Sequence, residues 1–140
     1  REAEDLPAER IAFLGPQAPG DYEAMLAAAD VLLVNQLPAV SDMALPSKLT
    51  SYFAAGRPVV AAVAAESEAA REIELAGAGI VLPAGEPAQL ASVLQSLHHE
   101  PAKAHTLGEA GRAYAASALS RDAALAEYEA MIRWATGKRR

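Results

Sequence analysis

Cysteine is absent from the 140-residue sequence, so no disulfide framework, thiolate metal site or cysteine nucleophile can form. Aromatic residues are scarce, at 5% of the sequence. Basic residues are few as well: 12 lysines and arginines stand against 18 acidic residues, and the net charge is −6. Because nucleic-acid binding needs cations spread along one face, we expect no nucleic-acid partner.

Long hydrophobic runs are also missing. The longest run follows Pro58 and covers residues 59–65, far short of the roughly 20 residues that a transmembrane helix needs. Alanine, by contrast, is abundant, with 35 residues, and it favours helices that pack closely on a sheet. The length fits a single domain over residues 1–140, with no internal repeat or boundary.

Short apolar runs alternate with helical patterns. Each run is apolar at successive positions, which predicts strands that are buried on both faces. Such runs cover residues 11–14, 31–34, 59–63 and 80–82. Strands that alternate with helices predict an α/β fold, in which a parallel sheet carries helices on both faces.

Local signals mark where the intervening helices begin and end. Asp21 is expected to cap the first helix, Pro46 to open the second, and Gly56 and Gly77 to end the second and third. A fourth helix is predicted to start at Pro87.

Beyond Pro101 no strand pattern returns, and two helices are predicted over residues 102–116 and 122–136. Ser120 is expected to cap the last helix, with Trp134 packed between helices. An inner stripe is predicted on that helix, made of Leu125, Tyr128, Met131, Ile132 and Ala135. The basic residues 138–140 are interpreted as a solvated tail or, alternatively, as a contact with a membrane surface or partner.

In open parallel sheets, ligands bind beyond the carboxyl ends of the strands. Three loops are expected there, at residues 15–21, 35–48 and 64–68. The middle loop leads into a helix start at Ser47 and Lys48, where free backbone N–H groups, a hydroxyl and an ammonium predict an anion site suited to a phosphate or diphosphate. The alternative is that Ser47 only caps the helix and Lys48 is an ordinary surface lysine.

Two sequence stretches carry a resemblance to a known family. Residues 45–61 read LPSKLTSYFAAGRPVVA and residues 76–87 read AGAGIVLPAGEP. With the 11–15, 22–34 and 109–112 segments, they resemble the donor-binding C-terminal domain of family 4 glycosyltransferases, GT-B-type enzymes of bacterial surface polysaccharide synthesis. The PSKLTSY variant is most similar to colanic-acid and O-antigen enzymes.

The resemblance implies a Rossmann-like C-terminal half that ends in two helices. It also implies a retaining transferase that moves a sugar from a nucleoside-diphosphate sugar to a glycan or lipid-linked acceptor, without a metal or other cofactor. The acceptor domain would lie N-terminal to this chain, so residues 1–140 would be an incomplete domain that is inactive alone. A cytoplasmic location follows, with peripheral association of the parent at the inner face of the membrane.

The family's binding roles fall on particular positions. The resemblance assigns the base-binding loop to Gly15, Pro16 and Gln17, and the diphosphate-binding helix start to Leu45, Pro46, Ser47 and Lys48.

Two glutamates of the family are missing, and Met43 and Ser51 occupy their positions. Asp42 is the candidate replacement for the catalytic carboxylate, and Ser51 is the candidate ribose ligand. Because of this departure, two alternatives stay open: a non-catalytic binding or assembly module, and a GT-B-type sugar-nucleotide epimerase.

The family's strand order, 3-2-1-4-5-6, predicts a gap in the sheet, because the four expected strands match the third to the sixth. Residues 11–14 would then rearrange, pair with a second copy or leave the piece marginally stable.

Other polar groups are expected to be structural. We interpret His98, His99 and His105 as surface residues rather than metal ligands. Glu66 and Glu68 are expected to favour a helix start, with contact to donor hydroxyls as the alternative.

Overall fold

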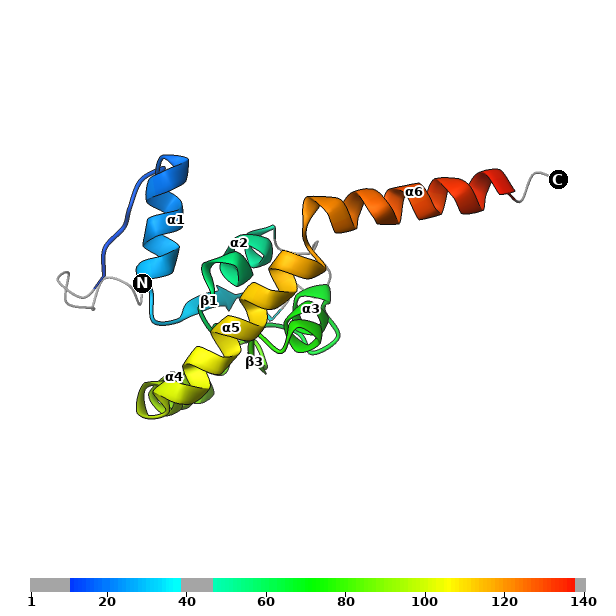
Figure 1. Ribbon diagram of the computed structural model, residues 1–140. Helices are drawn as coiled ribbons and strands as arrows, with labels where there is room; N and C mark the ends of the chain where they lie inside the picture. Colours follow the sequence, from blue (N-terminus) through cyan, green and yellow to red (C-terminus); the bar gives the residue numbers. More distant parts are fainter. Residues whose placement is uncertain (1–10, 39–46, 138–140) are drawn as a thin grey trace.

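The computed structural model describes residues 11–38 and 47–137 of the chain. Within those ranges a small sheet lies among five helices, and a sixth helix extends away from this body (Figure 1). In chain order the elements are α1 (Pro19–Ala28), β1 (Leu32–Asn35), α2 (Lys48–Ala55), β2 (Val59–Ala62), α3 (Glu68–Ala76), β3 (Gly79–Leu82), α4 (Pro87–His99), α5 (Pro101–Ser117) and α6 (Arg121–Gly137).

The three strands form one parallel sheet in the order β1-β2-β3. Leu32 is opposite Val59, and Val59 is opposite Gly79. Strand β2 is buried along its whole length, because it lies between two strands and is covered on both faces. The predicted α/β architecture with a parallel sheet is therefore confirmed.

Both faces of the sheet are covered. On one face, Leu49 and Phe53 of α2 and Ile73 of α3 pack with β2, and the Phe53 ring makes an edge-to-face contact with Tyr114 of α5, 5.9 Å between centroids. On the other face, Leu97 of α4 belongs to a second cluster formed with β2 and β3. The prediction of helices on both faces is confirmed.

Several predicted helix ends are also confirmed. Helix α2 ends at Gly56 and α3 at Gly77, both in the left-handed conformation, with φ of 67° and 59°. Ser120, the predicted cap of the last helix, accepts a hydrogen bond from the Ala123 N–H at 3.1 Å. Ser67, for which the sequence predicts no capping role, caps α3 by accepting a hydrogen bond from the Ala70 N–H at 3.2 Å. Such local signals position the loops at both ends of the sheet.

The predicted first strand is wrong. Residues 11–14 form no strand and are exposed, with Phe13 at 88% and Leu14 at 62%. Strand conformation is stabilised by a hydrogen-bonded neighbouring strand, and none of the three described strands pairs with residues 11–14. The three strands that do form are contiguous, so the described sheet has no internal gap.

The predicted start of α1 is also wrong. The helix begins at Pro19, whose fixed φ suits a first helical position, and Asp21 lies within the first turn instead of capping it. Of its apolar residues only Leu26 is buried, while Met25 is exposed, because α1 touches the body along a narrow strip of α2.

The predicted burial of α6 is wrong as well. The helix itself is confirmed, but none of its residues is buried. Its expected inner stripe faces outward because α6 extends away from the body (Figure 1). The exposed fractions are 50–63% for Leu125, Tyr128, Met131, Ile132 and Trp134.

Candidate functional site

The start of α2 lies at the carboxyl edge of the sheet, because the chain reaches it from the end of β1. Ser47 and Lys48 are exposed there, whereas Leu49 is buried and anchors the helix to the core. Ser47 occupies the N-cap position of α2, but its side chain makes no capping hydrogen bond. Of the other predicted site residues, Asp42, Leu45 and Pro46 lie outside the described residues.

The first turn of α2 carries no acidic residue. Its N–H groups and the positive end of the helix dipole are therefore not neutralised from within the helix. Lys48 adds a full positive charge at the same end. The described part of this helix start thus has the electrostatics that an anion requires.

A pocket of about 620 Å³ lies between α1 and α2. Ser51, half-buried and one helical turn after Lys48, lines it from α2 together with Thr50. Tyr22 and Glu23 line it from α1. The remaining lining residues are Pro19, Leu26, Ala27, Ala54, Ala55 and Arg112. Polar groups therefore meet an apolar wall, as in many small-molecule sites.

The predicted base-binding loop leads directly into this pocket. Gly15, Pro16 and Gln17 are exposed, and the Gln17 side-chain amide donates a hydrogen bond to the Gly15 carbonyl at 2.8 Å. Pro19, two residues further on, is part of the pocket wall. Pro19, which follows the loop, therefore lines the same pocket as Ser51, although the two residues are far apart in the sequence.

A second cavity, of about 450 Å³, lies beyond the carboxyl ends of β2 and β3. Glu66, Glu74 and Pro38 are among its lining residues. Glu68 instead lies in the first turn of α3 and approaches Arg71 at 4.0 Å on the surface. The two neighbouring glutamates thus separate: Glu68 suits the helix dipole, and Glu66 faces a cavity.

The aromatic residues of α2 belong to the core. Phe53 is completely buried, and Tyr52 packs at the edge of the same cluster. Burial, with a smaller contribution from Tyr22, raises the pKa of Tyr52. Because a phenol with a raised pKa stays neutral, Tyr52 contributes no charge to the helix start.

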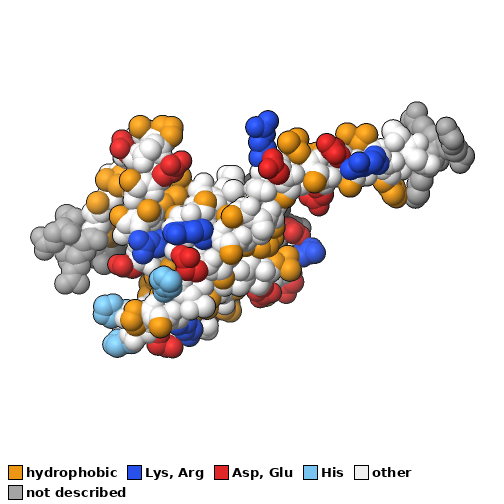
Figure 2. Space-filling view, viewed as in Figure 1, with side chains coloured by type: hydrophobic (Ala, Val, Ile, Leu, Met, Phe, Trp, Pro, Cys, Tyr) orange, Lys and Arg blue, Asp and Glu red, His pale blue; other side chains and the backbone are white. Residues whose placement is uncertain are grey.

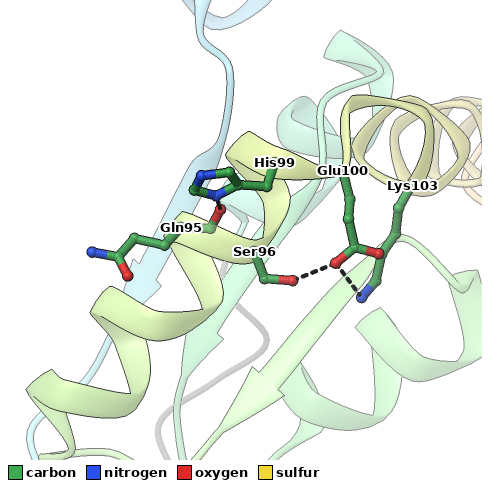
Figure 3. A network of polar contacts seen from close by, with 5 residues as sticks. All are labelled: Gln95, Ser96, His99, Glu100 and Lys103. Atoms are coloured by element: carbon green, nitrogen blue, oxygen red, sulfur yellow. Dashed lines mark hydrogen bonds and ion pairs between the residues drawn. The ribbon is translucent and has the colours of Figure 1, made fainter.

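The histidines lie at the junction of α4 and α5, and all of them are exposed as predicted. His99 Nδ1 lies 2.7 Å from the Gln95 carbonyl oxygen, and the Glu100 carboxylate accepts a hydrogen bond from Ser96 at 2.7 Å (Figure 3). That bond, and then the nearby Lys103, lower the pKa of Glu100. These contacts are local to the helix junction.

The surface around these elements has no continuous basic stripe on the face drawn in Figure 2, where Arg and Lys side chains lie among acidic and hydrophobic ones. Within residues 11–38 and 47–137, no three His, Asp or Glu side chains are grouped to hold a metal ion. Over the same ranges, no helix combines the length and the apolar character needed to span a bilayer.

Of the residues that line the pocket between α1 and α2, the sequence predicts only Ser51 as a site residue, and it misses Glu23, Thr50 and Arg112 among others. Arg112 donates a hydrogen bond to the Ala55 carbonyl at 3.2 Å and pairs with Glu109 at 3.5 Å. Thr50 could have been found from its position beside Ser51. Glu23 carries no sequence signal, because its role in the pocket depends on how α1 crosses α2.

The chain resembles a known protein in its three-dimensional structure. No protein-family model matches the chain, and no curated protein sequence matches it. Among solved structures it is similar to a sucrose-phosphate synthase from Thermosynechococcus elongatus, with a TM-score of 0.73 and 25% sequence identity. The match covers 94% of this chain but only 31% of that chain. Because the neighbour is a GT-B glycosyltransferase, the chain has the fold of the Rossmann-like C-terminal half of such an enzyme.

Proposed function

We propose that the chain is the donor-binding part of a retaining glycosyltransferase that uses a nucleoside-diphosphate sugar. One observation carries this proposal: the exposed start of α2, with Ser47 and Lys48, lies at the carboxyl edge of the sheet beside a pocket of about 620 Å³. Ligands of open parallel sheets bind at that edge. The structural similarity to a GT-B enzyme supports the same class.

In this proposal, different residues bind the diphosphate, the ribose and the base of the donor. The N–H groups at the start of α2 and the Lys48 ammonium hold the diphosphate. Ser51 holds a ribose hydroxyl one turn further on, and the backbone of Gly15, Pro16 and Gln17 contacts the base. Together they place the bond between the sugar and the diphosphate at the carboxyl edge of the sheet.

Transfer makes the nucleoside diphosphate a leaving group, and negative charge grows on its phosphate oxygens as the bond to the sugar breaks. A positive helix end and Lys48 stabilise that charge, so this part of the reaction requires no metal ion or other cofactor. Asp42 is the proposed carboxylate near the transferred sugar. The product diphosphate leaves from the same helix start.

The acceptor belongs to a separate N-terminal domain of a longer parent enzyme, and the 140-residue chain alone is inactive in transfer. We place the parent in family 4, among the enzymes of surface polysaccharide synthesis of the colanic-acid type. There the acceptor is a glycan or a lipid-linked sugar. The parent works in the cytoplasm, at the inner face of the membrane.

Calorimetric titration with UDP and with GDP, in the presence of EDTA, tests the proposal. At least one of them should bind, and Lys48→Ala should weaken that binding about tenfold, because a charge-assisted contact to phosphate is worth about 1.5 to 3 kcal/mol. Lys103→Ala is the matched control, since Lys103 is an exposed lysine on α5. It should leave the affinity unchanged.

Two other results would replace the proposal. Absence of heat with both nucleotides would favour a non-catalytic assembly module on the same scaffold. Interconversion of a sugar nucleotide by the parent enzyme without any acceptor would identify an epimerase.

A further inference from the structure

The pocket between α1 and α2 has one carboxylate among its lining groups, that of Glu23. It enters from α1, while Ser51 and Thr50 supply hydroxyls from α2 on the facing wall. Glu23 is exposed, so its carboxylate is open to solvent and to a ligand. Within the described residues no hydrogen bond or ion pair engages this carboxylate.

The other charged residue of the pocket is already engaged. The Arg112 guanidinium donates to the Ala55 carbonyl at 3.2 Å and pairs with Glu109 at 3.5 Å. Arg112 therefore serves the end of α2 and the surface of α5. Glu23 keeps its full capacity to accept hydrogen bonds.

A carboxylate opposite two hydroxyls suits a ligand that carries neighbouring hydroxyl groups. The two carboxylate oxygens can accept from both hydroxyls of a vicinal diol, and serine and threonine can donate or accept from the other side. Carboxylates hold the ribose of nucleotides in this way in other doubly wound folds. A phosphate, by contrast, would be repelled by Glu23.

The position along α2 agrees with this chemistry. Lys48 and the helix start attract the diphosphate, and Ser51 lies one turn further on, where the pocket begins. A ribose joined to a diphosphate at the start of α2 can therefore reach the pocket, where Glu23 presents a carboxylate. The charge is positive at Lys48 on α2 and negative at Glu23 on α1, which matches a nucleotide whose diphosphate lies at the start of α2 and whose sugar lies in the pocket.

We propose that Glu23 is the ribose-binding carboxylate of this chain and acts from α1, opposite Ser51. The inference rests on the proposed function, because it assumes that the diphosphate lies at the start of α2. It assigns the ribose contact to a different helix from the one that binds the phosphates. Affinity then depends on how α1 packs against α2.

Comparison of ribonucleotides with 2′-deoxyribonucleotides tests this role. The 140-residue chain is titrated with UDP, GDP and their 2′-deoxy forms, and we expect about tenfold tighter binding of the ribose form. Glu23→Gln should reduce that preference to less than about threefold. Its affinity for the 2′-deoxy form should fall less than its affinity for the ribose form, because the 2′-deoxy form has only one of the two hydroxyls that Glu23 would hold.

Asp21→Asn is the matched control, since Asp21 is exposed, carries the same charge and lies on the same helix outside the pocket lining. It should retain the full ribose preference. Glu23→Asp should retain part of it. A merely structural role of Glu23 would change the affinity for both sugar forms equally and leave their ratio unchanged.

The outcomes separate the two proposals. If nucleotides bind and Lys48→Ala weakens them, but Glu23→Gln keeps the ribose preference, the inference is overturned and the proposed function stands. If neither nucleotide binds the unchanged chain, both are overturned.

Discussion

Helices α5 and α6 have the same length, 17 residues, but opposite surroundings. Helix α5 packs against α2 and α3 and buries Gly108 and Gly111. Helix α6 presents large apolar side chains and buries none of its residues. The helix with small residues is thus the one that contacts the body.

Close approach of backbones explains this difference. A Cβ atom added to Gly108 would overlap the Gly56 carbonyl oxygen, and one added to Gly111 would lie 3.0 Å from the Ala78 Cβ and 3.4 Å from a Phe53 ring carbon. Glycine at these positions therefore allows α5 to lie directly on the end of α2 and on β3. A stripe of large apolar side chains, as on α6, indicates that a helix could be buried, but it does not show that another element covers it.

The largest effect in this comparison is expected from Gly108→Ala. Alanine is the better helix former by about 1 kcal/mol, but here its methyl group would overlap the Gly56 carbonyl, so we expect a net loss of about 2 to 3 kcal/mol in the free energy of unfolding. Urea denaturation measures it. Gly137→Ala on α6 is the control, since nothing lies within 4 Å of the added Cβ. Equal effects at the two sites would contradict the contrast between the helices.

A smaller effect is expected from Tyr114→Phe on α5. The Tyr114 hydroxyl donates a hydrogen bond to the Glu72 carboxylate at 3.0 Å, and its loss should cost about 1 kcal/mol while the ring contact with Phe53 remains. Tyr128→Phe on the exposed face of α6 should have no measurable effect. Thermal unfolding of both variants makes the comparison.

The Tyr114→Phe variant should also change how the stability of the protein depends on pH. Burial, and then the hydrogen bond and charge of Glu72, raise the pKa of Tyr114 in the folded protein. The unfolded chain loses this proton first, near pH 10, so the stabilisation is complete below that pH and is lost as the pH rises through the folded-state pKa. Tyr114→Phe should lose less stability between pH 9 and 11, and a slope equal to that of the unchanged chain would disprove the assignment.

The smallest effect is expected from Met131→Gln. Because Met131 is 56% exposed on α6, its replacement by a polar residue of similar size should change the free energy of unfolding by less than about 0.5 kcal/mol. A loss above about 1.5 kcal/mol in urea denaturation would show that this face of α6 is buried in solution.

The sequence predicts the centre of the fold well, because the residues that end the helices and the apolar run of the buried strand indicate the same elements there. The apolar run of β2 lies between Gly56, which ends α2, and Ser67, which caps α3, and Gly77 ends α3 before β3. Each of these residues acts through its local conformation. Residues 11–14 have an equally apolar run, yet they form no strand. An apolar run shows what a segment could bury, and it carries no information on whether a neighbouring strand is present.

The candidate site divides in the same way. Lys48 and Ser51 follow from the helix that the sequence predicts, so their positions relative to each other could be anticipated. Glu23 could not, since its approach to Ser51 depends on the angle at which α1 meets α2. Contacts within one helix can thus be predicted from the sequence, whereas contacts between two helices require the structure.

The most direct test of the central claim is a map of amide chemical shifts in the ¹⁵N-labelled chain during titration with UDP or GDP. We expect the largest changes at residues 47–51, smaller ones at residues 15–23, and none on α6. Changes confined to the α4–α5 junction around His98 and Glu100, at the opposite edge of the sheet, would contradict a donor site at the start of α2.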